Sequence, residues 1–362
     1  MNFTPEVARA RTGPGWLTER RQSAAERFAS AALPTPSEEA WRYSRIEELN
    51  LDRYHPAEAP AAVEVDLSAA SSPIAVGSAS AAATVICVNG TVVSIDLDEG
   101  LQAKGVRVVD LTTLAEAPEA LGRCADASPD AFLHLHDAFM AGGVFVFVPS
   151  GVFVEAPIVI EHRFEGGDSG DGGVASFPRT LVVVGEDGEA SVLERFISSA
   201  GLHLVVPVTE IVVGDAARVS YLGLQDHAPS AWQIALQRSV VGKQATLRSS
   251  AVALGGDYAR LRVEALLEGE GASSEMVAVY FANESQMLDF RTLQDHDAPH
   301  TNSELLFKGA VEDSARSVYS GLVRLRKTAQ RANATQTNRN LVLSEGASAE
   351  SIPNLEIEAN DV

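Results

Sequence analysis

The feature that most constrains this chain is a long series of short extended segments that begins at Val144 and continues to the end. Each segment alternates apolar and polar residues and is bounded by Gly, Pro, Asp or Asn. In 261–265 every second residue is apolar, which buries one face of a strand. No helical stripe of about ten residues interrupts the series, which argues against a βαβ fold. The clearest predicted strands are 144–148, 158–161, 181–184, 202–206, 218–222, 234–240, 261–267 and 277–281.

Such a series leaves two architectures open, an antiparallel sandwich or barrel and a β-solenoid of stacked coils. Residues 331–344 favour the solenoid because they are rich in Asn and Thr and still read as extended. Stacked coils can pair such side chains with like groups above and below, whereas buried amides in a sandwich core are costly. No fixed-period repeat accompanies the pattern.

The region before Val144 is more varied. A helix is predicted over 14–32, opened by Pro14 and ended by Pro34. Residues 56–82, rich in Ala, Ser and Pro, indicate a linker or loosely packed loop. Asn89-Gly90 between two apolar runs predicts a hairpin.

A second helix is predicted to start at Ser128-Pro129-Asp130, with Ser128 as its cap, and to end at Gly142-Gly143. The chain thus divides into a helical and linker region (1–83), a mixed α/β lead-in (84–143) and a β-solenoid core (144–362). We expect Trp41 and Tyr43 to anchor the N-terminal region on the solenoid.

Composition narrows the functional classes. The 362 residues are 46% hydrophobic and 21% charged, as in a globular protein, and the formal net charge is −21. This balance argues against nucleic-acid binding and indicates either solubility or a preference for basic partner surfaces. The N-terminus lacks a signal-peptide pattern, no apolar run reaches about 18 residues, and only two cysteines are present, so a cytoplasmic location is expected.

Two clusters of polar residues are candidate sites. Asp295, His296, Asp297 and His300 combine carboxylate and imidazole groups that suit zinc or iron, but Pro299 and the Asp residues also indicate a turn. Arg324, Arg326, Lys327 and Arg331 form a basic patch, which is either a solvated strand face or a contact for an acidic neighbour.

The order and spacing of several blocks resemble the SufB/SufD family of iron–sulfur cluster assembly proteins. The blocks Trp16-Leu17 with Arg20-Arg21, and 39–43, are similar to the opening of SufD rather than SufB. A further block runs from Asp137 to Pro149. The strongest likeness lies in the C-terminal third, in 295–309, 315–321, 336–344 and 353–362.

The resemblance implies a right-handed parallel β-helix preceded by a helical domain. It also implies a scaffold role without enzymatic activity, in which a SufD-like subunit pairs with SufB and each binds a copy of the ATPase SufC. This chain by itself would bind no cofactor, and the iron–sulfur cluster would belong to the complex. On this basis we expect pairing with SufB through 328–358, with Asn338, Asn340, Leu341, Leu343, Leu355 and Ile357 as candidate interface residues.

In the family, the block that ends here at Asp361-Val362 is followed by a Cys-Ser-His-Gly-Ala-Thr-like stretch and a helical C-terminal domain that docks SufC. We therefore expect a chain truncated relative to the family, without its Cys and His candidates for metal contact. Neither Cys87 nor Cys124 matches that cysteine. The alternative is a β-helix enzyme acting on polysaccharides, which would need calcium-binding Asp residues and a basic catalytic residue.

Overall fold

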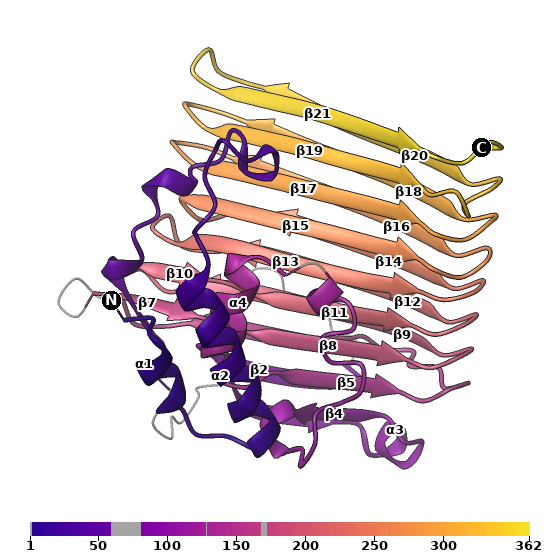
Figure 1. Ribbon diagram of the computed structural model, residues 1–362, viewed down its shortest axis with the longest axis horizontal. Coiled ribbons are helices and arrows are strands. Elements are labelled where there is room, and N and C mark those ends of the chain that lie inside the picture. The colour runs from indigo at the N-terminus through magenta and orange to yellow at the C-terminus, as the bar shows by residue number, and fades with distance from the viewer. Residues whose placement is uncertain (1, 59–80, 128, 168–171) are drawn as a thin grey trace.

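The computed structural model describes residues 2–58, 81–127, 129–167 and 172–362, and its main body is a parallel β-solenoid. In Figure 1 the coils stack from the first strands at the bottom to the last, yellow strands at the top. Within the described residues the strands form two sheets, here called sheet 1 and sheet 2, of twelve and nine strands. The solenoid predicted from the sequence is confirmed, and the sandwich and barrel alternatives are excluded.

Sheet 1 follows the order β21 (Ser348–Ile357), β19 (Arg316–Leu325), β17 (Met287–His296), β15 (Tyr258–Leu267), β13 (Trp232–Val241), β11 (Val208–Val213), β8 (Arg179–Val184), β5 (Val144–Val148) and β4 (Arg107–Asp110), with β1 (Tyr54–Pro56), β7 (Gly173–Ser176) and β10 (His203–Val205) beside this path. Sheet 2 follows the order β20 (Asn333–Val342), β18 (Asn302–Val311), β16 (Ser273–Ala282), β14 (Thr246–Ala253), β12 (Arg218–Asp226), β9 (Glu189–Ser198), β6 (Ile158–Phe164), β2 (Ala83–Val88) and β3 (Thr91–Leu97).

Successive coils pair in parallel, but their lengths differ. In sheet 1, Trp232 pairs with Tyr258 after 26 residues, whereas Arg316 pairs with Ser348 after 32. A coil can lengthen or shorten at its turns without disturbing the strand register, because only the strands pair. This variation explains why the sequence shows no fixed period.

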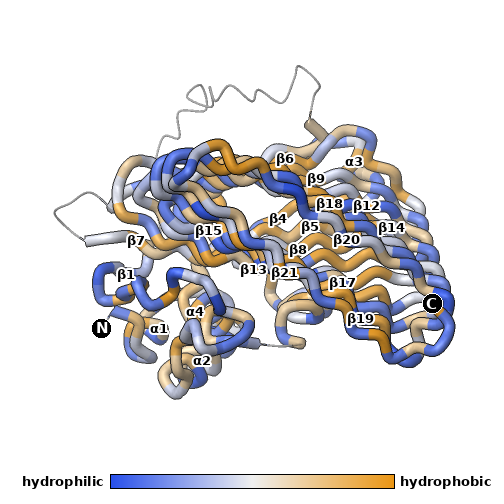
Figure 2. The backbone as a smooth tube through the Cα atoms, turned by 90° about the horizontal axis from the view of Figure 1, so that it is seen from above, coloured by the Kyte–Doolittle hydropathy of each residue, from blue (hydrophilic) through white to orange (hydrophobic). Residues whose placement is uncertain are grey.

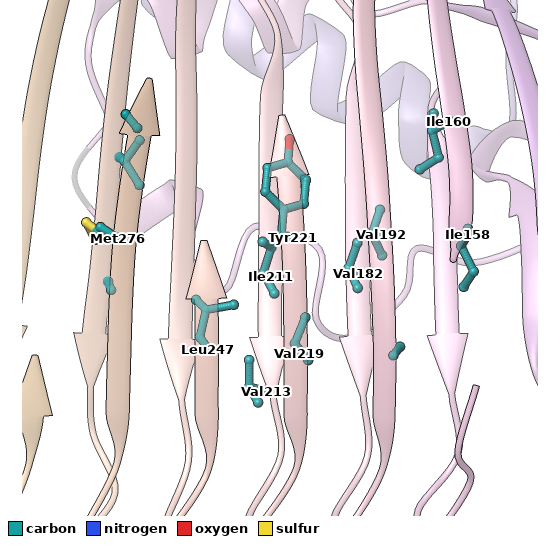
Figure 3. Close-up of a cluster of buried hydrophobic side chains, with 14 of the residues drawn as sticks. Ile158, Ile160, Val182, Val192, Ile211, Val213, Val219, Tyr221, Leu247 and Met276 are labelled. Carbon is teal, nitrogen blue, oxygen red and sulfur yellow. The ribbon is translucent and has the colours of Figure 1, made fainter. Parts of the chain in front are cut away.

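The core lies between the two sheets. Figure 3 shows apolar side chains from both sheets pointing toward each other, among them Ile158, Val182 and Ile211. All three are fully buried. Each buried side chain of this size stabilises the fold by about 1.5–3 kcal/mol, and stacking repeats this contribution from coil to coil.

The solenoid begins earlier than the sequence predicted. The hairpin at Asn89-Gly90 is confirmed, with φ of 50° and 84° at the two turn residues. However, β2 also pairs in parallel with β6, so the hairpin is part of sheet 2. Strands β2, β3 and β4 therefore belong to the two sheets although they precede Val144, and so does the short strand β1.

The helical elements precede the regular coils and are α1 (Pro5–Arg9), α2 (Gly15–Ser30), α3 (Glu99–Ala103) and α4 (Ala131–Phe139), with 3-10 turns η1 (Glu39–Trp41), η2 (Ile46–Glu48), η3 (Leu51–Arg53), η5 (Leu111–Thr113) and η6 (Ala125–Ala127). The helix predicted over 14–32 is α2. For α4 the cap is Asp130, whose side chain accepts a hydrogen bond from the Leu133 amide. Ser128, the predicted cap, and most of the predicted linker (59–80) lie outside the described residues.

Helices α1, α2 and α4 lie together on one side of the solenoid, as Figure 2 shows. A buried charge cluster fixes them there. Arg179 on β8 donates to Asp137 of α4 over 3.1 Å and also bonds Glu210 of β11. Glu210 in turn accepts from the backbone amides of Gly122, Cys124 and Ala125.

The segment between α2 and β1 crosses the outer face of sheet 1 (Figure 1). The Arg260 guanidinium lies 3.9 Å from the centre of the buried Trp41 ring, and it donates to the Ala40 carbonyl over 2.6 Å. Trp41 therefore anchors this segment as predicted. Tyr43 does not, because it is 42% exposed.

Candidate protein-interaction site

The last coil, formed by β20 and β21, ends the stack with its inward-facing side chains partly open. Leu355 pairs in register with Val323, and Ile357 with Leu325. Val323 and Leu325 are 3% and 4% exposed, whereas Leu355 and Ile357 are 61% and 51% exposed. The same row of the core is thus buried in one coil and open in the next, because β21 pairs on one side only among the strands that the structure describes.

The polar candidates of this coil form a hydrogen-bonded cluster. Asn340 donates to Asn338 over 2.7 Å, and both residues bond the Tyr280 hydroxyl, which lies two strands away on β16. Tyr280 reaches them by passing over Gly309 of β18, where a Cβ would lie 1.8 Å from the tyrosine ring. A glycine is therefore required at this position, and the two amides are held in fixed orientations.

The interpretation of the Asn- and Thr-rich segment as a stack of like side chains holds in part. Asn333 donates to Asn302 of the coil below over 2.8 Å, as expected for an asparagine ladder. Asn338 and Asn340 instead bond each other within one coil.

The six candidate interface residues fall on two faces. Asn338, Asn340, Leu355 and Ile357 line the open interior of the last coil, and with Val342 they are called the end surface below. Leu341 and Leu343, 65% and 55% exposed, lie at the edge of this surface, with Leu341 on the outer face of sheet 2. Only Asn338, Asn340, Leu355 and Ile357 lie at positions that continue the core of the preceding coil.

The four residues considered as metal ligands are not brought together. His296 points into the core, where its two ring nitrogens contact the Thr301 and Ser303 hydroxyls over 2.7 and 2.8 Å. Asp295 lies on the outer face and bonds Arg326, as does Asp297. His300 occupies a turn with φ of 58°. Alternation along the strand separates the side chains, and across the described residues no group of three or more His, Cys, Asp and Glu is arranged to hold a metal.

The basic patch predicted from the sequence is largely paired within the chain. Arg324 bonds Glu356 over 2.9 Å, and Arg326 bonds Asp295 with two nitrogens. Arg331 bonds Asp361 over 3.3 Å. These arginines link neighbouring coils. The geometry therefore favours the interpretation of the basic patch as a strand face, with its arginines in ion pairs inside the chain.

Both cysteines are buried, and neither forms a disulfide. Burial and the neighbouring Glu210 carboxylate raise the pKa of the Cys124 thiol to about 12. Cys124 is therefore a poor thiolate ligand in the folded chain. Cys87 faces the core beside His162, its partner on β6.

A charged cluster inside the core was not predicted from the sequence. Glu194 on β9 is 1% exposed and accepts four hydrogen bonds, from His162, Thr180, Thr209 and Tyr221. Burial lowers the pKa of His162, but Cys87 and Glu194 raise it to about 10, so the imidazole is protonated. The only sequence signal is Glu194 at an inward position of an alternating strand, and its partners lie on four other strands.

Comparisons with known proteins agree with this architecture. Residues 166–362 match the family model described as SUF system FeS cluster assembly, SufBD core domain, and residues 10–160 match the SufBD protein N-terminal region. The core match covers more than half of the chain, which therefore belongs to the SufBD family.

Individual relatives carry the same description. An iron–sulfur cluster assembly SufBD family protein of Mycobacterium tuberculosis is 36% identical over 200 residues, which cover 53% of this chain and 49% of that protein. A Staphylococcus saprophyticus protein of the same description is 25% identical over 275 residues, which cover 74% of this chain and 58% of the relative. The chain thus spans about half the length of the curated relatives it matches.

Among the described residues, no helix is long and apolar enough to cross a membrane.

Proposed function

We propose that this chain acts as a SufD-type subunit of an iron–sulfur cluster assembly complex and pairs with a SufB-type subunit through the end surface. The observation that carries the proposal is the change in exposure between the last two coils. Leu355 and Ile357 occupy core positions and yet are more than half exposed. A second solenoid of the same width would bury them by continuing the stack.

The polar part of the end surface suits a specific partner. Asn338 and Asn340 are held by Tyr280, by each other and by the Ser351 hydroxyl, so the acceptor capacity that remains on the Asn340 carbonyl oxygen is offered at a defined position. Strand edges provide further backbone groups, because within the described part of the chain β20 and β21 each pair on one side only. Apolar contact would supply affinity, and the amides would set the register.

The remaining roles follow from family membership. The chain would act as a scaffold rather than an enzyme, with ATP hydrolysis performed by a SufC-type ATPase that docks on a C-terminal helical region of the family. The cluster is cargo of the complex in this proposal, and the raised pKa of the buried Cys124 thiol makes that residue a poor cluster ligand. A SufD-type rather than SufB-type role rests on the Trp16 and Trp41 blocks. A cytoplasmic location is part of the same proposal.

The polysaccharide-active alternative finds no support in the described residues. It requires a groove with clustered calcium ligands. Asp295 and Asp297, the acidic residues of the one local candidate cluster, bond Arg326 instead.

Co-expression with the SufB-type subunit of the same organism tests the proposal. We expect one heteromeric peak in size exclusion with light scattering, and at least about a hundredfold weaker affinity for the L355S/I357S variant, because two large apolar side chains no longer become buried. Phe153, 54% exposed at a distant coil, offers the matched control F153S, which should bind normally. Separate peaks for the two wild-type proteins would refute the proposed pairing.

A further inference from the structure

The outer face of sheet 2 carries a second exposed apolar surface, distinct from the end surface. Val279 and Phe281 on β16 are 55% and 36% exposed, and Leu341 on β20 is 65% exposed. Lys308 and Ala310 on β18 and Arg339 on β20 are in register with these residues. These six residues are called the lateral patch. The principal contacts of β16, β18 and β20 within the described chain are with other strands, so no described helix covers this face.

The patch consists of two neighbouring rows that run across the strands. One row reads Val279, Lys308, Arg339 from β16 to β20. The next row, two residues further along each strand, reads Phe281, Ala310, Leu341. A basic pair thus borders the apolar row at two of its three positions, Ala310 and Leu341.

The basic pair has no acidic residue in register with it. Lys308 and Arg339 lie directly opposite each other on neighbouring strands, and like charges in this arrangement are destabilising. Both are exposed, and neither forms an ion pair with any part of the chain that the structure describes, although the sequence contains 49 acidic residues. On the same face, Arg248 of β14 has Glu275 of β16 opposite it and bonds it over 2.7 Å. The sheet can therefore place an acid beside a base, and at the lateral patch it does not.

We propose that the lateral patch is a docking site for an amphipathic helix of a partner protein that carries two acidic residues along the edge of its apolar stripe. Neighbouring strands lie about 4.8 Å apart, and helix positions i and i+3 or i+4 are about 5–6 Å apart. A helix that crosses the strands at right angles would therefore place carboxylates at two such positions above Lys308 and Arg339.

The dimensions of the second row agree with the same occupant. The two rows are about 7 Å apart, since each residue advances a strand by about 3.4 Å. A helix about 10 Å in diameter covers both rows at once. Its apolar stripe would lie on Phe281, Ala310 and Leu341. Its acidic edge would neutralise the repulsion between Lys308 and Arg339, which the isolated chain retains. This site does not depend on the end surface or on the proposed function.

The test uses the purified chain and two synthetic helical peptides of about 18 residues. The acidic peptide carries a leucine stripe edged by two Glu residues four positions apart, and the basic twin carries Lys at the same two positions. Fluorescence anisotropy should show the acidic peptide binding the wild type at least about tenfold more tightly than its twin, with a difference that shrinks at high salt. In K308E/R339E this preference should reverse, and V279S/F281S should weaken binding of both peptides.

The control variant K243E/K327E changes the net charge equally at two exposed turn lysines away from the patch, and it should retain the wild-type preference. Leu341 is left unchanged because it adjoins the end surface.

The proposal is overturned if the wild type binds neither peptide or binds both equally, or if the control variant shifts the preference as far as K308E/R339E. It is also overturned if light scattering shows a wild-type dimer that K308E/R339E abolishes, since the patch would then bind a second copy of this chain. Loss of SufB pairing in L355S/I357S, with peptide binding intact, would separate the two surfaces.

Discussion

Replacing Glu194 by Gln tests the buried charge cluster between the two sheets. Each carboxylate oxygen accepts two hydrogen bonds: Oε1 from His162 and Thr180, and Oε2 from Thr209 and Tyr221. Gln preserves the shape and one acceptor oxygen, but its NH₂ group faces two donors. It also leaves the protonated His162 without its counter-charge inside the core.

The structure sets the expected size of this loss. Two buried donors left without an acceptor cost about 1–3 kcal/mol each. Removing one partner of a buried ion pair costs about 3–5 kcal/mol in other proteins, which agrees with that range. We therefore expect E194Q to lower the free energy of unfolding by about 3–5 kcal/mol in urea denaturation at pH 7.

The pH dependence of this difference is a second readout. The pKa of His162 is raised from 6.5 to about 10, so its contribution is complete below pH 6.5 and is lost as the pH rises through 10. The pKa of Glu194 is lowered, because hydrogen bonds and charge from His162 outweigh burial, so its contribution is lost as the pH falls below 4.5. The stability difference between wild type and E194Q should therefore be largest near neutral pH and shrink toward pH 10.

A matched control is Glu275, whose pair with Arg248 is partly exposed on the same sheet. E275Q should cost less than about 1 kcal/mol. The buried ion pair between Glu194 and His162 would be contradicted if E194Q cost no more than E275Q, or if nitrogen-15 NMR showed the wild-type His162 imidazole neutral at pH 7.

Three further predictions concern other contacts. G309A should lower the free energy of unfolding by about 1–3 kcal/mol in urea, because its Cβ would displace the Tyr280 ring, and an unchanged transition midpoint would contradict this. R260M should speed proteolysis within 33–50, because the Trp41 segment loses its hydrogen bond and ring contact; a wild-type digestion pattern would argue against that anchoring. Cys124, with its thiol pKa near 12, should react with iodoacetamide at pH 8 far more slowly in the folded than in the urea-unfolded chain, as mass spectrometry would show, and equal rates would exclude the buried thiol.

The local pattern was sufficient to predict much of the fold. Alternation in segments such as 261–267 predicted strands, and the structure extends this one to Tyr258–Leu267. Asn89-Gly90 predicted its hairpin because both residues tolerate positive φ. The strands themselves were predicted too short, because polar residues at the coil corners still pair with residues of neighbouring coils.

Local sequence patterns did not predict which side chains meet at the candidate sites. His296, Asp297 and His300 are close in sequence, but a strand and a turn send their side chains in different directions. The four groups around Glu194 are instead drawn from separate strands, and no local pattern marks them.

Local sequence patterns predicted a strand-rich chain with an N-terminal helical part and favoured a solenoid over a sandwich, because strand alternation, turn chemistry and helix signals depend on residues that are near one another in the chain. Only the tertiary structure decided which coil positions are open, as at Leu355, and which charges meet, as Lys308 and Arg339 do. Pairing between coils sets those contacts, and the sequence does not reveal which residues pair because the coil length varies along the solenoid.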